Sequence, residues 1–149
     1  MIRRSVFGIT LVVLVGLAGH RVVRADAPMG RYTTPAAGTV YDTRTRLTWQ
    51  QNVDPNTYTW AGATMYCKDL ALAGGGWRLP SVKELVTLVD VGQKSPAIDR
   101  TFFPNTPSDY FWTSSPLAGD PSFAWFVNFL NGYSSTSDVG NAFRVRCVR

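Results

Sequence analysis

One segment before the middle of the chain has apolar residues at helical spacing. Thr59 comes just before it, with a side chain suited to an N-cap. The glycines at 74–76 follow it, and glycine commonly ends a helix. The sequence therefore predicts a first helix that begins after Thr59 and buries one face in the core. The residues that form this face are Trp60, Ala63, Cys67, Leu70 and Ala71.

A second helix is predicted from Ser81 to about Asp90. Ser81 and Glu84 have the spacing of a capping box, in which each side chain accepts a hydrogen bond from the backbone N–H of the other residue. This interpretation gives Glu84 a structural role rather than that of a catalytic acid. The apolar side of the helix is formed by Val82, Leu85, Val86, Leu88 and Val89.

Runs of β-branched and aromatic residues predict a first hairpin before these helices. Residues 39–42 and 45–49 form its strands, and the turn between them begins at Asp42. Residues 26–38 precede the hairpin as an extended lead-in. After the helices, residues 91–109 have no sustained period and predict a long loop. Three residues of this loop are expected to insert into the core: Ile98, Phe102 and Phe103.

Strand patterns return in the last third of the chain. Residues 111–114, 124–130 and 133–137 predict strands, and Asn131-Gly132 is typical of a type I′ turn between the last two. Residues 143–148 predict a closing strand, in which alternation places Phe143, Val145 and Cys147 on one side and Arg144 and Arg146 on the outward side.

These elements predict the α+β class. Helices come early and most of the antiparallel sheet comes late, which favours two helices packed on short antiparallel sheets joined by long loops. The length of 149 residues allows one domain with a real core. Five tryptophans are expected to fill mainly that core: Trp49, Trp60, Trp77, Trp112 and Trp125.

The N-terminal segment has the order of charges and apolar residues of a secretory signal peptide. Arg3 and Arg4 precede an apolar run at 6–19, which is shorter than a membrane span, and small residues follow it. Residues 1–25 are therefore predicted to be removed, by cleavage after Ala25 or Ala27. A retained membrane anchor is the alternative.

Removal of this segment changes the charge of the chain. Four of the 15 basic residues precede Ala25, so 11 basic and 10 acidic residues remain, with a net charge of +1. A protein that binds nucleic acid by charge carries a massed basic surface, and this composition does not favour one. The sequence therefore predicts an exported chain, periplasmic or secreted, with no nucleic-acid partner and no membrane span after processing.

Two cysteines, Cys67 and Cys147, lie in the part that remains. An exported chain with two cysteines most simply forms one disulfide. Two buried free thiols are the alternative. The long spacing and the absence of a C-x-x-C motif argue against catalytic redox chemistry.

Several motifs in order resemble those of one known family, the Lcl C-terminal domain family. The resemblance covers residues 39–149. The motifs are Trp-x-x-Ala…Tyr-Cys-x-x-Leu at 60–70, Gly-Trp-Arg-Leu-Pro-Ser-x-x-Glu-Leu at 76–85, Phe-Trp-Thr-Ser-Ser at 111–115, Ala-Trp-Phe-Val-Asn-Phe at 124–129 and Val-Arg-Cys-Val-Arg at 145–149.

The resemblance implies a C-type-lectin-like fold, related to that of the formylglycine-generating enzymes. In such folds a disulfide joins the first helix to the last strand, a role that Cys67 and Cys147 would fill. The domain after which the family is named is associated with adhesion and with binding of sulfated polysaccharides. That domain follows a collagen-like stalk, whereas no Gly-x-y repeat precedes residue 39 here.

The sequence offers little for metal or catalytic chemistry. Calcium-dependent lectins use a Glu-Pro-Asn or Gln-Pro-Asp tripeptide, which this sequence lacks, and a calcium site from scattered aspartates is possible but unsupported. The single histidine, His20, lies in the predicted signal segment, so we expect no zinc site and no catalytic triad. With both cysteines in a disulfide, no nucleophile for formylglycine chemistry remains. We therefore expect no enzyme activity and no cofactor. A glycosidase that uses a pair of carboxylates is the alternative, which the spacing of the aspartates does not favour.

The loops at 116–121 and 131–141 are predicted to form the contact surface of a recognition domain, because Ser, Gly, Asp, Asn and Tyr suit adaptable polar contacts. Its ligand would be a polysaccharide or a sulfated glycan, bound outside the cytoplasm. The alternative is a structural or protein-binding module of the cell envelope. The candidate ligand-binding residues are Tyr110, Asp120, Asn131, Tyr133, Asp138, Asn141, Arg144 and Arg146. For the two arginines, a solvated face or an ion pair with a nearby aspartate is the alternative.

Overall fold

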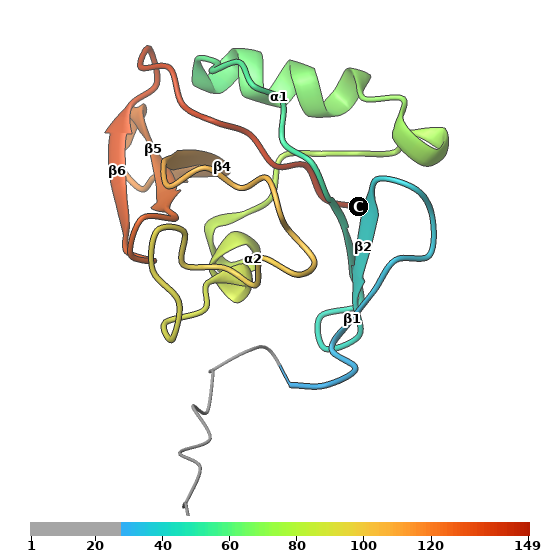
Figure 1. The fold of residues 1–149 in the computed structure, drawn as a ribbon. Helices are drawn as coiled ribbons and strands as arrows, with labels where there is room; N and C mark the ends of the chain where they lie inside the picture. Colours follow the sequence, from blue (N-terminus) through green and yellow to red (C-terminus); the bar gives the residue numbers. More distant parts are fainter. Residues whose placement is uncertain (1–27) are drawn as a thin grey trace, which may run out of the picture.

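The computed structural model describes residues 28–149. The predicted signal peptide, both cleavage positions and His20 lie outside these residues. The described chain has the predicted α+β class, with two antiparallel sheets of three strands each and two short α-helices (Figure 1). Helix α1 lies along one side of the molecule, and α2 lies between the two sheets.

The first sheet contains the predicted hairpin and one further strand. Strands β2 (Thr39–Asp42) and β3 (Leu47–Gln50) pair antiparallel, with Val40 opposite Trp49. Asp42 shapes the turn, because its carboxylate accepts a hydrogen bond from the Arg44 N–H. Strand β1 (Tyr32–Thr33) adds to β2, so part of the segment predicted as a lead-in belongs to the sheet.

Helix α1 (Trp60–Asp69) begins where the sequence predicts, and the Thr59 hydroxyl caps it by accepting from the Gly62 N–H. It ends before the glycines, because Leu70 is already extended, and a separate 3₁₀ turn follows at Leu72–Gly74. Of the predicted stripe, Ala63 and Cys67 are fully buried and Ala71 is exposed.

Helix α2 (Val82–Leu85) has the predicted capping box but is shorter than predicted. Ser81 accepts from the Glu84 N–H and Glu84 accepts from the Ser81 N–H, at 3.3 and 2.8 Å. The chain then narrows to a 3₁₀ turn at Val86–Leu88, after which Val89 is extended and bridges to Ile98. The β-branched residues of this turn favour helix only weakly.

The second sheet is formed by β4 (Tyr110–Leu117), β5 (Asp120–Asn128) and β6 (Ser134–Asp138), in that order. Of the two segments predicted as contact loops, 116–121 therefore lies largely in β4 and β5, whereas 131–141 contains β6, within one residue of the strand predicted at 133–137. The predicted type I′ turn is also wrong, since only Gly132 has a positive φ. Glycine is required there, because a Cβ would lie 2.4 Å from Val89 Cγ1.

The C-terminal segment joins the two sheets instead of extending one of them. Phe143 bridges to Tyr58, whereas Val148 bridges both to Trp49 of β3 and to Arg78. Neighbouring segments therefore cover this segment on both sides. Four consecutive residues are buried as a result, which the predicted alternation does not allow: Val145, Arg146, Cys147 and Val148.

The core lies on both faces of the second sheet. Phe111 and Val127 pack on one face with Leu85 and Leu88 of the α2 segment, and Ile98 and Phe103 from the long loop join them as predicted. Trp112 and Phe126 pack on the other face beneath α1. Trp49, Trp77 and Trp112 are buried, and Trp60 and Trp125 are partly buried.

The predicted disulfide is present and links helix α1 to the C-terminal segment. Cys67 of α1 is bonded to Cys147 of the C-terminal segment, with 5.4 Å between their Cα atoms, and both residues are fully buried. No helix among residues 28–149 is both long enough and apolar enough to span a bilayer.

Candidate ligand-binding site

Three aromatic rings surround Phe126 at one end of the second sheet, and we call Tyr110, Tyr133 and Phe143 the aromatic platform. Their ring centroids lie 4.9, 5.9 and 5.3 Å from that of Phe126, and all three pairs have edge-to-face geometry. Phe126 is buried, whereas Tyr110 and Tyr133 are 39% and 46% exposed. Exposed aromatic rings held by such contacts form a firm surface with little side-chain entropy left to lose on binding.

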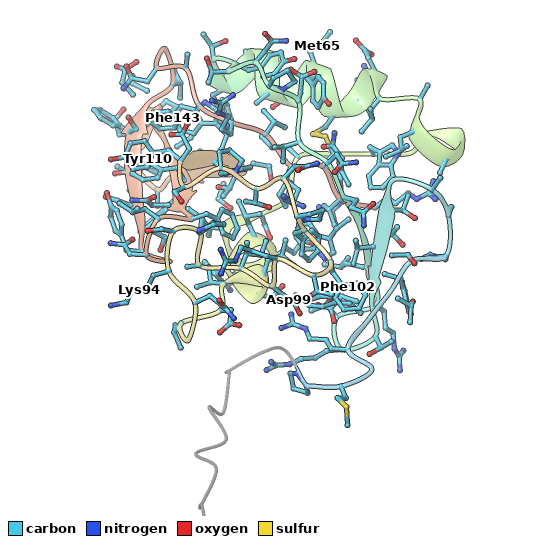
Figure 2. The ribbon with its side chains drawn as sticks, in the orientation of Figure 1. Met65, Lys94, Asp99, Phe102, Tyr110 and Phe143 are labelled. Carbon is cyan, nitrogen blue, oxygen red and sulfur yellow. A yellow bond between two sulfur atoms is a disulfide. The ribbon has the colours of Figure 1, made fainter. Side chains whose placement is uncertain are left out.

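The strand register explains why these rings meet. Trp112 of β4 lies opposite Phe126 of β5, and Tyr110 lies two residues earlier on the same face. The bridge to Tyr58 holds Phe143 over this face, where its ring stacks at 4.4 Å on Trp112. Figure 2 shows Tyr110 and Phe143 together beside β5 and β6, well away from Met65 on α1.

A charged pair borders the platform. Arg144 Nε lies 3.1 Å from a carboxylate oxygen of Asp109, and both side chains are partly exposed. Arg144 Nη1 also donates to the carbonyl of Pro55, which attaches the loop before Tyr58 to this border. The backbone N–H of Arg144 donates to the Tyr110 carbonyl, so the pair lies directly beside the platform.

The predicted ligand-binding residues separate into two groups. Asn131 lies next to the platform, where its side chain accepts from the Tyr133 N–H at 3.2 Å. Asp120, Asp138 and Asn141 lie toward the other end of β5, since Asp120 begins this strand and Asp138 pairs with Phe123. The structure therefore brings together Tyr110, Asn131, Tyr133 and Arg144.

The residues of the second group shape turns. Asp120 accepts from the Ser122 N–H, and Asp138 accepts from the Gly140 N–H, at 3.0 and 2.8 Å. Asn141 donates from its side chain to Ser137 at 2.8 Å. Such local hydrogen bonds account for Asp and Asn at these positions without a ligand.

The prediction that Arg146 faces outward is wrong. Its side chain is fully buried, and its guanidinium donates to the carbonyls of Gln50 and Gln51 and to the hydroxyl of Thr106. It also lies 4.6 Å above the ring of Phe103. Burial lowers the pKa of Arg146 to about 9, so the group remains charged at neutral pH. Arg146 is part of the core and has no access to a ligand.

Three contributors to the site are absent from the predicted ligand-binding residues: Phe126, Phe143 and Asp109. Strand alternation carries a signal for Phe126, because it must face away from Val127, which lies in the other core cluster. The predicted alternation places Phe143 opposite the outward-facing arginines, whereas the residue is partly exposed in the structure. No sequence pattern pairs Asp109 with Arg144, since 35 residues separate them.

Among residues 28–149, no three His, Cys, Asp or Glu side chains gather as metal ligands do. Asp109, Asp120 and Asp138 each bond to a backbone N–H one or two residues further along the chain.

Comparison with known proteins gives the family. The model of the Lcl C-terminal domain matches residues 38–149, which is nearly all of the described fold. No curated protein matches the chain. The match begins just before β2 and ends at the last residue, so it includes every strand except β1, together with the disulfide and the platform. The chain belongs to the Lcl C-terminal domain family.

Proposed function

We propose that this protein is a non-enzymatic recognition domain that binds a polysaccharide outside the cytoplasm, with sugar rings stacking on the aromatic platform. The proposal includes export by the N-terminal segment and the C-type-lectin-like fold that the family resemblance implies. The buried disulfide supports an oxidising compartment, because such bonds persist in exported proteins.

One observation carries the proposal, namely that Tyr110 and Tyr133 are exposed although ring contacts hold them in place. Tyrosine combines an apolar ring with a hydroxyl, which suits a sugar that has an apolar face and a polar rim. Asn131 and the Asp109–Arg144 pair supply hydrogen-bonding groups beside the rings. The exposed rings suit a polysaccharide chain that lies across them.

The charges at the site bear on the choice between neutral and sulfated polysaccharides. Arg146 is buried, and Arg144 shares its charge with Asp109 and with the Pro55 carbonyl. A sulfate would have to compete with the Asp109 carboxylate for the guanidinium. We therefore propose that stacking supplies most of the affinity and that Arg144 contributes a smaller, salt-dependent part.

A panel of immobilised neutral and sulfated polysaccharides, with a heparin column beside it, tests this function. The protein, with its disulfide formed, should be retained by at least one polysaccharide at low salt. Retention that persists in high salt indicates stacking, and retention that disappears indicates sulfate recognition. Absence of retention on every member at low salt contradicts the proposal.

The second candidate function is a structural or protein-binding module of the cell envelope. A different observation favours it, because strand β6 borders its sheet without a neighbour among the described residues. Uncovered strand edges pair with other strands. Crosslinking in the intact cell tests this candidate, and recovery of no partner other than the protein itself would contradict it.

A further inference from the structure

Among the described residues, the outer edges of strands β3 and β4 are covered by other backbone segments, whereas that of β6 is not. The outer edge of β4 is covered, since Trp112 N donates to the Arg144 carbonyl and Ser114 N to the Pro80 carbonyl. The outer edge of β3 is covered by the C-terminal segment, where Thr48 exchanges hydrogen bonds with Arg149. By contrast, no residue in 28–149 outside the second sheet bonds to the backbone of Ser134 or Thr136 in β6.

The register with β5 shows which groups of β6 face outward. Asn128 N donates to the Tyr133 carbonyl, and Val139 N donates to the Ser122 carbonyl. Hydrogen-bonded and non-hydrogen-bonded positions alternate in an antiparallel pair. The odd-numbered residues of β6 therefore bond to β5, whereas Ser134, Thr136 and Asp138 direct their N–H and C=O groups away from the sheet.

Strand β6 has few of the features that usually protect an edge, and its one charged residue is Asp138 at the end of the strand. Its sequence is Ser-Ser-Thr-Ser-Asp, without lysine, proline or a register shift. Proteins commonly use such features to prevent a free strand from pairing with another chain. The unprotected edge has small side chains, which let a second backbone approach.

We propose that β6 pairs antiparallel with β6 of a second copy of this chain, with the two Thr136 residues opposite each other on a twofold axis. This register overlaps the whole strand Ser134–Asp138 of each copy. The centre of this register is Thr136, whose backbone N–H and C=O groups face outward. The two Thr136 residues therefore exchange backbone hydrogen bonds across the axis, and Ser134 of each copy does so with Asp138 of the other. A centre on Ser135 or Ser137 would pair fewer residues, so the strand is self-complementary in one register.

The side chains fit the same register. The two Thr136 residues can exchange a cross-strand hydrogen bond, and Ser135 lies opposite Ser137. Asp138 lies opposite Ser134, so no like charges face each other. One position beyond the strand, the exposed ring of Tyr133 comes opposite Val139 of the second copy, which adds apolar contact at both ends. A short edge of this kind buries little area and predicts a weak dimer.

Sedimentation equilibrium of the purified protein over a wide concentration range tests the proposal. We expect a reversible monomer–dimer equilibrium for the protein as sequenced. Thr136→Lys and Thr136→Glu place like charges on the axis, and each variant should remain monomeric. A mixture of the two variants should restore the dimer, because opposite charges then meet. Ser114→Lys, on an exposed position of covered strand β4, is the matched control and should still form the dimer.

Amide hydrogen exchange identifies the interface directly. The N–H groups of Ser134 and Thr136 should exchange at least about tenfold more slowly at dimer-forming concentrations than in dilute protein, a change equal to about 1.4 kcal/mol. The circular dichroism spectrum of each variant shows whether it is folded. A protein that stays monomeric at all concentrations overturns the proposal, as does a dimer that both charged variants retain. Slowed exchange only with an added peptide of residues 132–139 would identify the edge as a peptide-binding site instead.

The pairing does not depend on the proposed function, because the dimer is measured without any polysaccharide. If both hold, the twofold axis places the two aromatic platforms on one continuous sheet. A polysaccharide chain that engages both platforms would then bind more tightly than either site alone allows.

Discussion

At the scale of single residues, Arg146 stands out because a charged side chain occupies the centre of the fold. No carboxylate of residues 28–149 pairs with it, and backbone carbonyls, a hydroxyl and the ring of Phe103 surround it instead. A buried charge is tolerated when most of its donors are satisfied. Arg146 thereby ties the end of β3 to the long loop at Thr106, so it joins segments far apart in sequence.

Replacement of Arg146 should therefore destabilise the fold strongly. Arg146→Ala leaves the carbonyls of Gln50 and Gln51 without their donor and opens a cavity, and it should lower the free energy of unfolding by about 3 kcal/mol or more. Arg146→Lys should recover only part of this loss, because a single ammonium cannot reach all three acceptors. Urea unfolding measures both variants, with exposed Arg44→Ala as the control. A loss below about 1 kcal/mol for Arg146→Ala would refute this role.

At the scale of elements, the cap of α2 is coupled to an ion pair. Glu84 accepts from Ser81 and also forms two hydrogen bonds with the guanidinium of Arg78, at 2.7 and 2.8 Å. These hydrogen bonds, those from Arg78 first, lower the pKa of Glu84 to about 2. One carboxylate therefore fixes both the start of α2 and the strand-like segment at Arg78, which bridges to Val148.

Because its pKa is lowered, Glu84 contributes to the free energy of unfolding in a way that decreases as pH falls. A carboxylate with a lower pKa in the folded state stabilises the protein above its unfolded pKa, and this stability is lost as pH falls toward the folded pKa. Glu84→Gln should lower the free energy of unfolding by about 1 kcal/mol at neutral pH, a modest value because the pair is partly exposed.

The difference in free energy of unfolding between Glu84→Gln and the parent protein should become smaller as pH falls from about 4.5 toward 2. Thermal unfolding across that pH range measures this difference. Asp69→Asn, at an exposed position at the end of α1, serves as the matched control. A difference that stays constant through this pH range would contradict the assigned pKa shift.

The elements that sequence patterns predicted are those set by local chemistry. The Thr59 cap, the Ser81–Glu84 capping box and the first hairpin depend on residues close together in the chain, and all are present. The errors arise where tertiary packing overrides a local rule. Alternation placed Arg146 outside, but segments on both sides cover it, and Gly132 serves a close approach of Val89 rather than a type I′ turn.

The candidate site was predictable only in part, for the same reason. Tyr110 and Tyr133 are candidates from the sequence because they border polar loops, and both are exposed and lie in the platform. The Asp109–Arg144 pair and the position of Phe143 depend on the C-terminal segment running along β4, which no short pattern encodes.

At the scale of the whole molecule, the disulfide and the C-terminal segment hold the two sheets and α1 together. Cys147 lies between residues that bond to β3 and to β4, and its partner Cys67 is on α1. The bond spans 80 residues of sequence, most of the fold. A crosslink that closes so long a loop restricts the unfolded chain and stabilises the native state.

Loss of the disulfide should therefore lower the stability of the fold. The double variant Cys67→Ala, Cys147→Ala should have a free energy of unfolding about 2–4 kcal/mol lower, given that the chain-entropy model sets an upper value of about 4 kcal/mol. Denaturant unfolding with and without reductant measures this change, and reductant should affect only the parent protein. Equal stability of the oxidised parent and the double variant would contradict it.

The most direct test of the proposed function is a binding titration with the polysaccharide of the panel that retains the protein best. The platform predicts that Tyr110→Ala and Tyr133→Ala each weaken binding by about tenfold or more, equal to about 1.4 kcal/mol, while the fold is retained. Met65→Ala removes a comparably exposed apolar side chain on α1 and should leave affinity unchanged. Undiminished affinity in the Tyr110→Ala, Tyr133→Ala double variant would contradict the account.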